Sequence, residues 1–349
     1  MYKGYPMQLD ERQDLVLALV IRDYIEYAQP VGSKHLVEIY GLDISPATVR
    51  NAMVDLTDAG YLRQPHTSAG RVPTEEGYRY FVRQLMGQTD LPQQTKRTIS
   101  HQFYQAGHDV DQWMRLAASV LAHQSQGAAL VTAPHLEGAR FKHVELIATH
   151  GRHVLMVLVL SGGDVRQQML ALAEPVSQER LSTAAGILND HCQGLTSVGI
   201  TALPNTLEAL EQDVLKLIVD EMERSAAILT GEVYRDGLTN VLAEPEFAEV
   251  GAARRALRVF EERSFLEDLL NRTVMTTNVG GVQVIIGGEN TWEELRECTV
   301  ILGRYGVPGL ATGTLGVLGP IRMSYGRTIS TVRFVAGLLS DLVEEINLE

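Results

Sequence analysis

The sequence predicts an α+β protein of two or three domains. A chain of 349 residues is too long for one compact domain, since domains average about 150 residues. Apolar residues recur at helical spacing in the first ninety residues, whereas short aliphatic runs separated by glycines, typical of antiparallel strands, dominate two later stretches. We therefore expect small helices and a hairpin first, followed by a sheet domain that contains a helical insertion.

Composition and cysteine usage exclude several classes of protein. Hydrophobic residues make up 45% and charged residues 21%, an ordinary globular balance, and no apolar stretch is long enough to span a membrane. The N-terminus has no hydrophobic segment of the secretory type, so we expect a cytoplasmic protein. The cysteines, Cys192 and Cys298, have no metal-binding spacing and are interpreted as core or surface residues rather than as ligands or a disulfide.

Three short helices are predicted in the first sixty residues. Apolar side chains recur every three or four positions over residues 10–27, and a second, shorter helix follows Ser33, whose hydroxyl is a suitable N-cap. Ser45 and Pro46 begin the third helix, because serine caps a helix well and proline is well tolerated at the first helical position.

Polar side chains occupy the free face of the third predicted helix. Its apolar residues share the other face, which leaves Thr48, Arg50 and Asn51 pointing outward, and these residue types suit base edges and phosphates in a major groove. Residues 61–74 then form a predicted hairpin that contains two arginines and no acidic residue. Three helices followed by such a hairpin predict a winged helix-turn-helix over residues 1–90, and therefore a DNA-binding domain.

The charge of the chain opposes this interpretation. The net charge is −13, and residues 1–90 contain nine Lys and Arg against twelve Asp and Glu. DNA binding then requires a locally positive surface, which we expect around Lys34, Arg50, Arg63 and Arg71. Affinity should fall steeply with salt, because phosphate contacts release counterions while the acidic surface repels DNA.

The remaining chain is predicted to contain one antiparallel sheet with an insertion. Residues 91–130 form a linker and a connecting helix, residues 131–175 and 275–349 supply the sheet domain, and residues 176–274 form a mostly helical insertion. A helix over about 330–343 ends the chain. The predicted strands are the aliphatic runs at 144–148, 154–160, 165–172, 282–286, 299–302 and 314–317.

The sequence predicts no catalytic, metal or cofactor site. It contains no recognisable nucleophile with an adjacent base and no paired carboxylates of catalytic spacing. The glycine-rich stretch at 303–319 lacks the pattern of a P-loop and of a dinucleotide fingerprint, so we interpret it as turns between strands. We therefore expect neither an enzyme nor a bound cofactor.

Seven short strings occur in a distinctive order along the chain. They are QPVGSK at 29–34, SPATVRN at 45–51, GYL at 60–62, QPHTSAGR at 64–71, GYRY at 77–80, IGGEN at 286–290 and GPIRMSY at 319–325. Together they resemble the HrcA family of heat-inducible transcription repressors. The string at 64–71 is far more specific than a generic helix-turn-helix, and the resemblance extends over the whole length of the chain.

This resemblance implies a fold, a function and partners. In the HrcA family a winged helix precedes a GAF-like domain that carries an inserted dimerising segment. Members repress chaperone operons of the groE and dnaK type by binding an inverted-repeat operator called CIRCE, and the chaperonin GroEL helps to keep them active. We therefore expect a homodimeric repressor that binds double-stranded DNA, since the two-fold symmetry of a dimer matches the two-fold symmetry of an inverted repeat.

The expected DNA contacts come from the helices and the hairpin. The third helix is expected to contact the major groove, the hairpin the DNA backbone or the minor groove, and the start of the second helix phosphates. The predicted DNA-binding residues are Ser33, Lys34, Ser45, Thr48, Arg50, Asn51, Gln64, His66, Thr67, Ser68 and Arg71. The alternative is a ligand-sensing regulator whose GAF-like domain binds a metabolite. A closed pocket lined by convergent polar groups favours that alternative, and an interior filled by aliphatic side chains opposes it.

Overall fold

The computed structural model describes residues 9–66, 69–87, 89–107, 109–136, 140–161, 165–203, 207–225, 232–273, 278–287, 291–308 and 310–346. The chain divides into two compact units. The first comprises Met1–Val131, Val233–Tyr305 and Thr314–Leu342, and the second comprises Thr132–Glu232, Gly306–Gly313 and Val343–Glu349. Within the described residues, no helix is long and apolar enough to cross a membrane.

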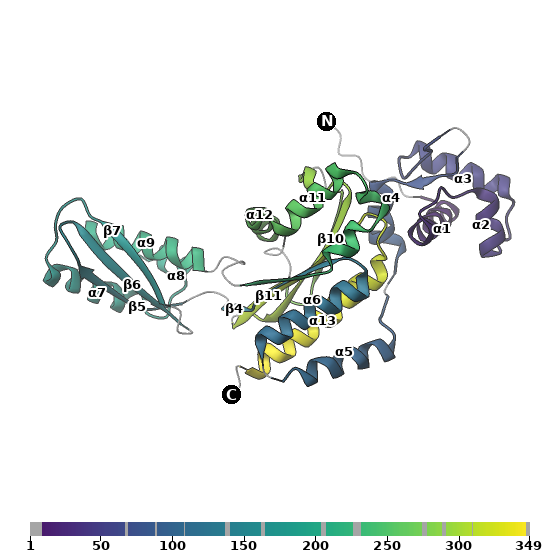
Figure 1. The fold of residues 1–349 in the computed structure, drawn as a ribbon. Helices are drawn as coiled ribbons and strands as arrows, with labels where there is room; N and C mark the ends of the chain where they lie inside the picture. Colours follow the sequence, from purple (N-terminus) through teal and green to yellow (C-terminus); the bar gives the residue numbers. More distant parts are fainter. Residues whose placement is uncertain are drawn as a thin grey trace. The chain divides into compact units, whose positions relative to one another are not determined.

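Three helices and a hairpin begin the first unit (Figure 1). They are α1 (Glu11–Tyr27), α2 (Ser33–Tyr40), α3 (Pro46–Asp58), β1 (Leu62–Arg63) and β2 (Val72–Pro73), and the two strands pair antiparallel as the sequence predicts. Their buried apolar side chains form a core that includes Leu17, Ile21, Leu36, Val49, Leu56 and Leu62. We call residues 9–66 and 69–87 the N-terminal segment.

Side-chain caps determine where two of these helices begin. The Asp10 carboxylate accepts a hydrogen bond from the Gln13 N–H at 2.7 Å, and the Gln13 side chain accepts one from the Asp10 N–H at 3.0 Å. The Ser45 hydroxyl accepts a hydrogen bond from the Thr48 N–H at 3.1 Å, which confirms the predicted start of α3. Each cap satisfies backbone donors that have no partner inside the helix.

The start of α2 differs from the prediction that Ser33 caps this helix. Gly32 occupies the cap position, and no side-chain hydrogen bond closes the start of the helix. The chain is already extended at Val31, which forms an isolated antiparallel bridge with Arg71, so the helix begins directly after Gly32. Ser33 is therefore the first residue of α2 rather than its cap.

A fourth helix connects the hairpin to the rest of the first unit. α4 (Glu75–Tyr80) begins after Thr74, whose hydroxyl accepts a hydrogen bond from the Gly77 N–H at 3.1 Å, and it continues into a π-helical turn, η1 (Phe81–Leu85). Tyr78 and Phe81 are buried, so this helix packs on the core of the first unit. The helices α5 (Gln93–Gln105) and α6 (Val110–Ser125) follow where the sequence predicts a linker and a connecting helix.

A six-stranded sheet follows these helices. Its strand order is β8 (Val233–Asp236), β3 (Ala128–Thr132), β11 (Ala311–Pro320), β10 (Cys298–Val307) and β9 (Val282–Ile286), and β4 (His135–Leu136) pairs separately with β11. The pairs of β10 with β9 and of β11 with β3 are antiparallel, as expected.

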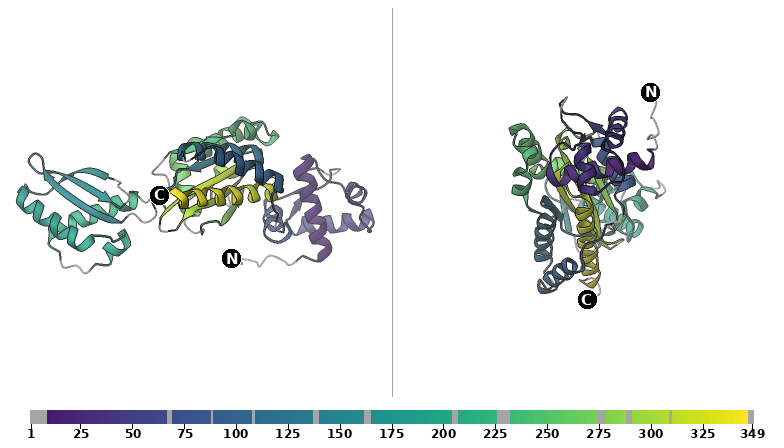
Figure 2. Two further views of the ribbon diagram at one scale, coloured as in Figure 1. Left: turned by 90° about the horizontal axis from the view of Figure 1, so that it is seen from below. Right: turned by 90° about the vertical axis from the view of Figure 1, so that its right-hand side faces the viewer.

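Two long helices, α6 and α13 (Tyr325–Ile346), lie side by side against this sheet (Figures 1 and 2). The Tyr305 hydroxyl donates a hydrogen bond to the Met114 sulfur of α6 at 3.2 Å. A Cβ added at Gly303 would lie 2.8 Å from the Val332 side chain of α13. Because residues two apart on a strand point to the same face, both helices cover the same face of β10.

The described residues of the first unit also include shorter helices. They are α10 (Leu238–Leu242), η2 (Pro245–Phe247), α11 (Val250–Glu261), α12 (Arg263–Thr273) and η5 (Glu293–Leu295). Arg255 of α11 forms a two-pronged ion pair with Glu297, with distances of 2.6 and 3.0 Å, and the Trp292 indole donates to Asp268 of α12 at 3.0 Å. These contacts attach α11 and α12 to the segment around η5, which precedes β10.

The second unit contains its own sheet and helices. Strands β5 (Phe141–Ala148), β6 (His153–Leu160) and β7 (Val165–Ala171) pair antiparallel in sequence order, and helices α7 (Gln178–Cys192), α8 (Ser197–Thr201) and α9 (Ala209–Ser225) follow. The Asn189 side chain of α7 bonds to the Val144 backbone N–H at 2.8 Å and to its carbonyl at 3.1 Å. The buried core between sheet and helices includes Phe141, Leu146, Met156, Leu158, Leu188 and Ile218.

This arrangement corrects the predicted assignment of strands and of the insertion. The sequence predicts that residues 131–175 and 275–349 share one sheet, but β5, β6 and β7 form a separate sheet. Their buried face packs on the helices that directly follow them, so the insertion already begins near residue 132 and ends near residue 232. The predicted insertion at 176–274 is therefore wrong at both ends, because α10, α11 and α12 belong to the first unit.

Candidate nucleic-acid interface

The exposed face of α3 carries the side chains predicted to contact bases. Arg50 and Asn51 are exposed, and neither side chain forms a hydrogen bond or ion pair with another described residue. Thr48 is half-buried, and its hydroxyl lies 2.9 Å from the Ser45 hydroxyl, next to the capped start of the helix. Ser45 and Thr48 therefore shape the start of α3, whereas Arg50 and Asn51 remain available to a ligand.

A small cleft brings four of the predicted residues together. Ser33 at the start of α2, Arg50 on α3, and Gln64 and Arg71 on the hairpin line a cleft of about 220 Å³. These residues are separated by up to 38 positions in the sequence (71 − 33), so the fold itself creates the cluster. The cleft combines the donors of two guanidinium groups, a hydroxyl and an amide, which are suited to the acceptor atoms of phosphates and of base edges.

Backbone contacts hold the hairpin against the turn between α1 and α2. Val31 and Arg71 each donate a backbone hydrogen bond to the carbonyl of the other at 2.9 Å. A Cβ added at Gly70 would lie 2.3 Å from the Val31 carbonyl oxygen, so a side chain at this position would clash with the backbone. Glycine is therefore required for the close approach of the hairpin to this turn.

Two of the predicted hairpin residues also stabilise the hairpin. The Arg71 Nε donates to the Thr57 hydroxyl at 2.9 Å, and that hydroxyl donates to the Met53 carbonyl of α3 at 2.7 Å. The Gln64 amide donates to the Ala69 carbonyl at 3.0 Å and so crosses the hairpin turn. Arg71 thus links the hairpin to α3 through one of its five N–H donors.

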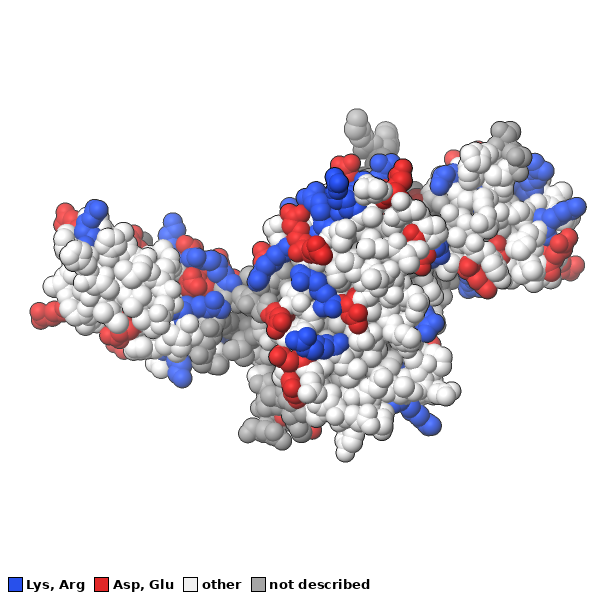
Figure 3. Space-filling view, viewed as in Figure 1, with Lys and Arg blue, Asp and Glu red and all other residues white. Residues whose placement is uncertain are grey.

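The remaining predicted residues lie outside the cleft or outside the described residues. Lys34 is exposed on the first turn of α2. His66 is exposed on the hairpin, a few residues after β1. Thr67 and Ser68 lie outside the described residues. Figure 3 shows acidic and basic side chains interspersed on the visible face of the N-terminal segment, at the right of the view. This mixed surface agrees with the near balance of charges in the sequence, so positive charge is restricted to small regions.

The interior between the sheet and its helices bears on the ligand-sensing alternative. The β11 side chains are buried along the whole strand, and a Cβ added at Gly316 would lie 2.5 Å from the Leu302 side chain. The Val332 side chain of α13 lies close to Gly303 of β10, so there is also little space between this helix and the sheet. Aliphatic side chains therefore fill these parts of the interior, which opposes a metabolite pocket there.

Known proteins match this chain over nearly its whole length. The heat-inducible transcription repressor HrcA of Roseiflexus castenholzii is 44% identical over 346 residues, covering 97% of this chain and 95% of that protein. The repressor of the same name from Herpetosiphon aurantiacus is 43% identical over 347 residues, covering 97% of each protein. The family model "HrcA protein C terminal domain" matches residues 111–329. The chain belongs to the HrcA family.

A solved structure shares the fold of this HrcA-family chain. The crystal structure of a hypothetical protein, 23% identical in sequence, superposes with a TM-score of 0.56 and covers 97% of this chain and 98% of that one. The matched domain model includes the strings at 286–290 and 319–325, and the full-length relatives also cover the N-terminal segment.

Sequence reasoning missed the residues that hold the candidate interface in place. Val31 and Gly70 lie inside strings that resemble the HrcA family, but no local pattern indicates that their backbones touch. A glycine directly before a strand in a hairpin was the available signal, since it often indicates a close backbone approach. Arg79, in the string at 77–80, contacts a strand more than 200 positions away, and nothing in the local sequence predicts this partner.

Proposed function

We propose that this protein is a heat-inducible transcription repressor that binds double-stranded DNA through its N-terminal segment, acting as a winged helix. The observation that carries the proposal is the exposed polar face of α3 beside the cleft where Ser33, Arg50, Gln64 and Arg71 meet. Relatives that bear the name of heat-inducible repressor over nearly their full length support it. α3 has 13 residues, so it is about 20 Å long and fits a major groove about 12 Å wide.

Each group of residues has a distinct role in this proposal. Arg50 and Asn51 face base edges in the major groove, where arginine pairs well with guanine and asparagine with adenine. Ser45 and Thr48 lie near a phosphate at the start of α3, where the helix dipole favours an anion. The backbone or minor-groove contacts come from Ser33, Lys34, Gln64, His66, Thr67, Ser68 and Arg71.

The operator in this proposal is the inverted repeat CIRCE, bound by a homodimer with one winged helix in each half-site. A two-fold symmetric protein places its two recognition helices in equivalent positions only on a two-fold symmetric site. Binding two half-sites at once also raises affinity without adding contacts to either one. This compensates for the acidic surface, which weakens each single contact region.

The second unit supplies the dimer interface in this proposal. One face of its sheet packs on α7 and α9, whereas the other carries exposed apolar side chains. Ile147, Val165 and Met169 are 41%, 51% and 54% exposed, respectively. Ile147 lies opposite Leu155, which lies opposite Met169, so these residues form an apolar row across all three strands. An apolar face of this kind is suited to a symmetric interface with a second copy of the same unit.

The chaperonin GroEL acts on this repressor in the proposal by restoring its folded form after heat. Repression then depends on free chaperonin, so the supply of chaperones controls their own synthesis. Heat releases the repressor from the operator because the DNA-binding form unfolds. Refolding then restores operator binding.

A binding assay with purified protein tests the proposed function. Fluorescence anisotropy compares a duplex containing CIRCE with a duplex of the same length in which both half-sites are scrambled. We expect a Kd of about 10⁻⁸ M for the operator at physiological salt, and an affinity for the scrambled duplex that is at least about a thousandfold weaker. Equal affinity for both duplexes contradicts the proposal.

The role of the chaperonin is tested by heating the purified protein mildly and then measuring operator binding. Binding should return in the presence of GroEL and ATP. Recovery to the same extent without chaperonin contradicts the proposed role of GroEL but not the proposed DNA binding.

A further inference from the structure

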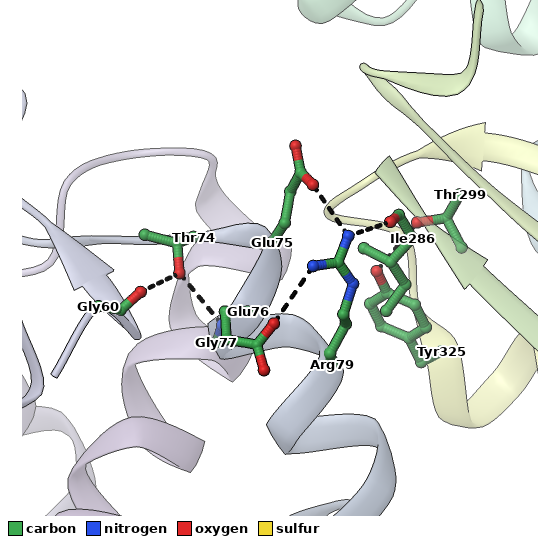
Figure 4. A network of polar contacts seen from close by, with 9 residues as sticks. All are labelled: Gly60, Thr74, Glu75, Glu76, Gly77, Arg79, Ile286, Thr299 and Tyr325. Carbon is green, nitrogen blue, oxygen red and sulfur yellow. Dashed lines mark hydrogen bonds and ion pairs between the residues drawn. The ribbon is translucent and has the colours of Figure 1, made fainter. Parts of the chain in front are cut away.

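Arg79 of α4 connects the N-terminal segment to the sheet of the first unit. Its guanidinium donates to the carbonyl oxygen of Ile286, at the end of β9, at 2.8 Å (Figure 4). The same group forms ion pairs with Glu75 at 3.0 Å and with Glu76 at 3.2 Å. The Arg79 side chain is only 14% exposed and Ile286 is buried, so the bond to this carbonyl lies largely away from water, where a charged donor binds a carbonyl oxygen strongly. The Glu75 and Glu76 carboxylates are more exposed, so their ion pairs with Arg79 contribute less.

Further contacts beside Arg79 attach the same region to α13. The Tyr78 ring packs against the Tyr325 ring with their centroids 5.8 Å apart, and both side chains are buried. Beyond α4, the Ser330 hydroxyl of α13 donates to the Thr89 carbonyl at 2.6 Å. The N-terminal segment and Thr89, just beyond it, are thus attached to β9 and α13 at three separate points, which together restrict the rotation of this segment.

The other side of α4 is fixed to the DNA-binding elements. The Tyr80 hydroxyl donates to Asp14 of α1 at 2.9 Å, and the Thr74 hydroxyl donates to the Gly60 carbonyl at 2.7 Å. A Cβ added at Gly77 would lie 2.2 Å from the Tyr61 carbonyl oxygen, so α4 lies directly against the start of the hairpin. α4 therefore links α1 and the hairpin on one side to β9 and α13 on the other.

The two C-terminal strings that resemble the HrcA family meet at this link. Ile286 begins the first string, and Tyr325 ends the second. Gly287 has a φ of +63°, and a Cβ added there would lie 2.3 Å from the Glu75 carboxylate. The first string thus supplies the carbonyl that accepts from Arg79 and a glycine that leaves space for Glu75, a partner of Arg79.

We propose that Arg79 is a positioning residue that fixes the orientation of the winged helix on the sheet domain and thereby sets the distance between operator half-sites that the dimer accepts. This inference rests on the proposed function, namely binding of an inverted repeat by two winged helices. A winged helix that can turn freely on the sheet domain lets a dimer accept several spacings, whereas a winged helix that is held to this domain narrows the range of spacings. Arg79 makes no contact with DNA in this mechanism, so it affects spacing and not the reading of a single half-site.

A spacing series with the full-length protein tests this inference. Duplexes carry one half-site, or two half-sites whose natural spacing is changed by one or two base pairs. Each base pair rotates the half-sites by roughly 35° relative to each other, so the wild-type protein should lose at least about tenfold in affinity per step. Arg79→Ala should bind the natural operator about tenfold more weakly and lose less than about threefold per step, because its winged helices can reorient. Its affinity for one half-site should stay within about twofold of wild type.

Arg83→Ala is the matched control, because Arg83 lies one turn further along and is exposed. It should keep the wild-type dependence on spacing. Gly287→Ala perturbs the same link from the sheet side by displacing Glu75 from Arg79, and it should also weaken the dependence on spacing. The inference is overturned if both Arg79→Ala and Gly287→Ala keep the wild-type dependence. It is also overturned if Arg79→Ala loses half-site binding while Gly287→Ala behaves as wild type, since Arg79 would then only stabilise the N-terminal segment.

The same series separates failure of the inference from failure of the proposed function. Wild-type protein that prefers neither the half-site nor the operator over scrambled DNA contradicts the proposed function itself, and the inference with it. Wild-type protein that binds the operator specifically, with variants that keep its dependence on spacing, contradicts only the role of Arg79.

Discussion

Val31 and Arg71 exchange two backbone hydrogen bonds of 2.9 Å, which join the turn before α2 to the returning strand of the hairpin. The two strings at 29–34 and 64–71 therefore meet in space, although more than thirty residues separate Val31 from Arg71. The Arg71 side chain extends the same link to Thr57 of α3. In the proposed function, α3 and the hairpin contact one duplex together, so they need a fixed relative position, and these bonds provide it.

Gly70→Ala should weaken both the fold of the N-terminal segment and DNA binding. The new methyl group would lie 2.3 Å from the Val31 carbonyl oxygen, so either the bridge to Arg71 breaks or the backbone shifts. We expect a loss of about 1–3 kcal/mol in the free energy of unfolding, measured by urea denaturation. Gly32→Ala is the matched control, because a Cβ there meets nothing within 4 Å and the expected cost is only the smaller one of alanine at the cap of α2. Equal stability of the two variants contradicts the argument.

Arg50→Ala and Lys34→Ala should weaken DNA binding in different ways. Arg50 lies on the exposed face of α3, so its loss should cost about 1–3 kcal/mol on the operator and little on random DNA. Lys34 lies on the first turn of α2, and its loss should weaken binding to every duplex alike and reduce the salt dependence by about one ion. Anisotropy titrations at several salt concentrations measure both effects. Equal losses on operator and random DNA for Arg50→Ala would mean that it contacts only phosphate.

Local signals predicted the N-terminal segment well, because capping residues and helical spacing are determined by neighbouring residues. Ser45 caps α3 as expected. The sheet assignment failed for a physical reason: alternating burial along β5, β6 and β7 indicates that one face is covered, but not by which elements. The contact of Arg79 with Ile286 joins residues 207 positions apart, and such pairs follow from the tertiary fold alone.

Met169→Asp should dissociate the proposed homodimer without unfolding the second unit. Met169 is 54% exposed on β7, next to Leu155 of β6, so a carboxylate there is tolerated in a single copy. In a symmetric interface the new carboxylate would lose its hydration, so we expect the dimer dissociation constant to rise by at least about tenfold. Analytical ultracentrifugation measures this constant. Val198→Asp on α8 is the control, since Val198 is 77% exposed outside the sheet, and an equal effect of both substitutions contradicts the proposed interface.

The two thiols should resist alkylation in the folded protein and report the opening of each unit. Burial raises the pKa of Cys192 to about 11 and that of Cys298 to about 12, from an ordinary value of 9.0. Cys192 lies in the core of the second unit, and Cys298 begins β10 in the first. At pH 8.5, iodoacetamide should therefore modify each thiol only when its unit opens. Labelling during slow warming, followed by mass spectrometry of peptides, identifies which unit opens first, and rapid labelling of both thiols at low temperature contradicts their burial.

The same pKa values predict a loss of stability in alkali. A thiol whose pKa is higher in the folded than in the unfolded chain stabilises the fold fully below pH 9.0, and this contribution is lost as the pH rises towards 11 or 12. We expect about 1 kcal/mol per thiol to be lost between pH 8 and 10. Buried tyrosines such as Tyr305, whose pKa burial also raises, add to the total loss at higher pH. Urea denaturation at pH 8 and pH 10 therefore measures the loss in the free energy of unfolding for wild type and for Cys298→Ala. The part due to Cys298 is the difference between these two losses. An identical pH dependence of the two proteins contradicts the assignment.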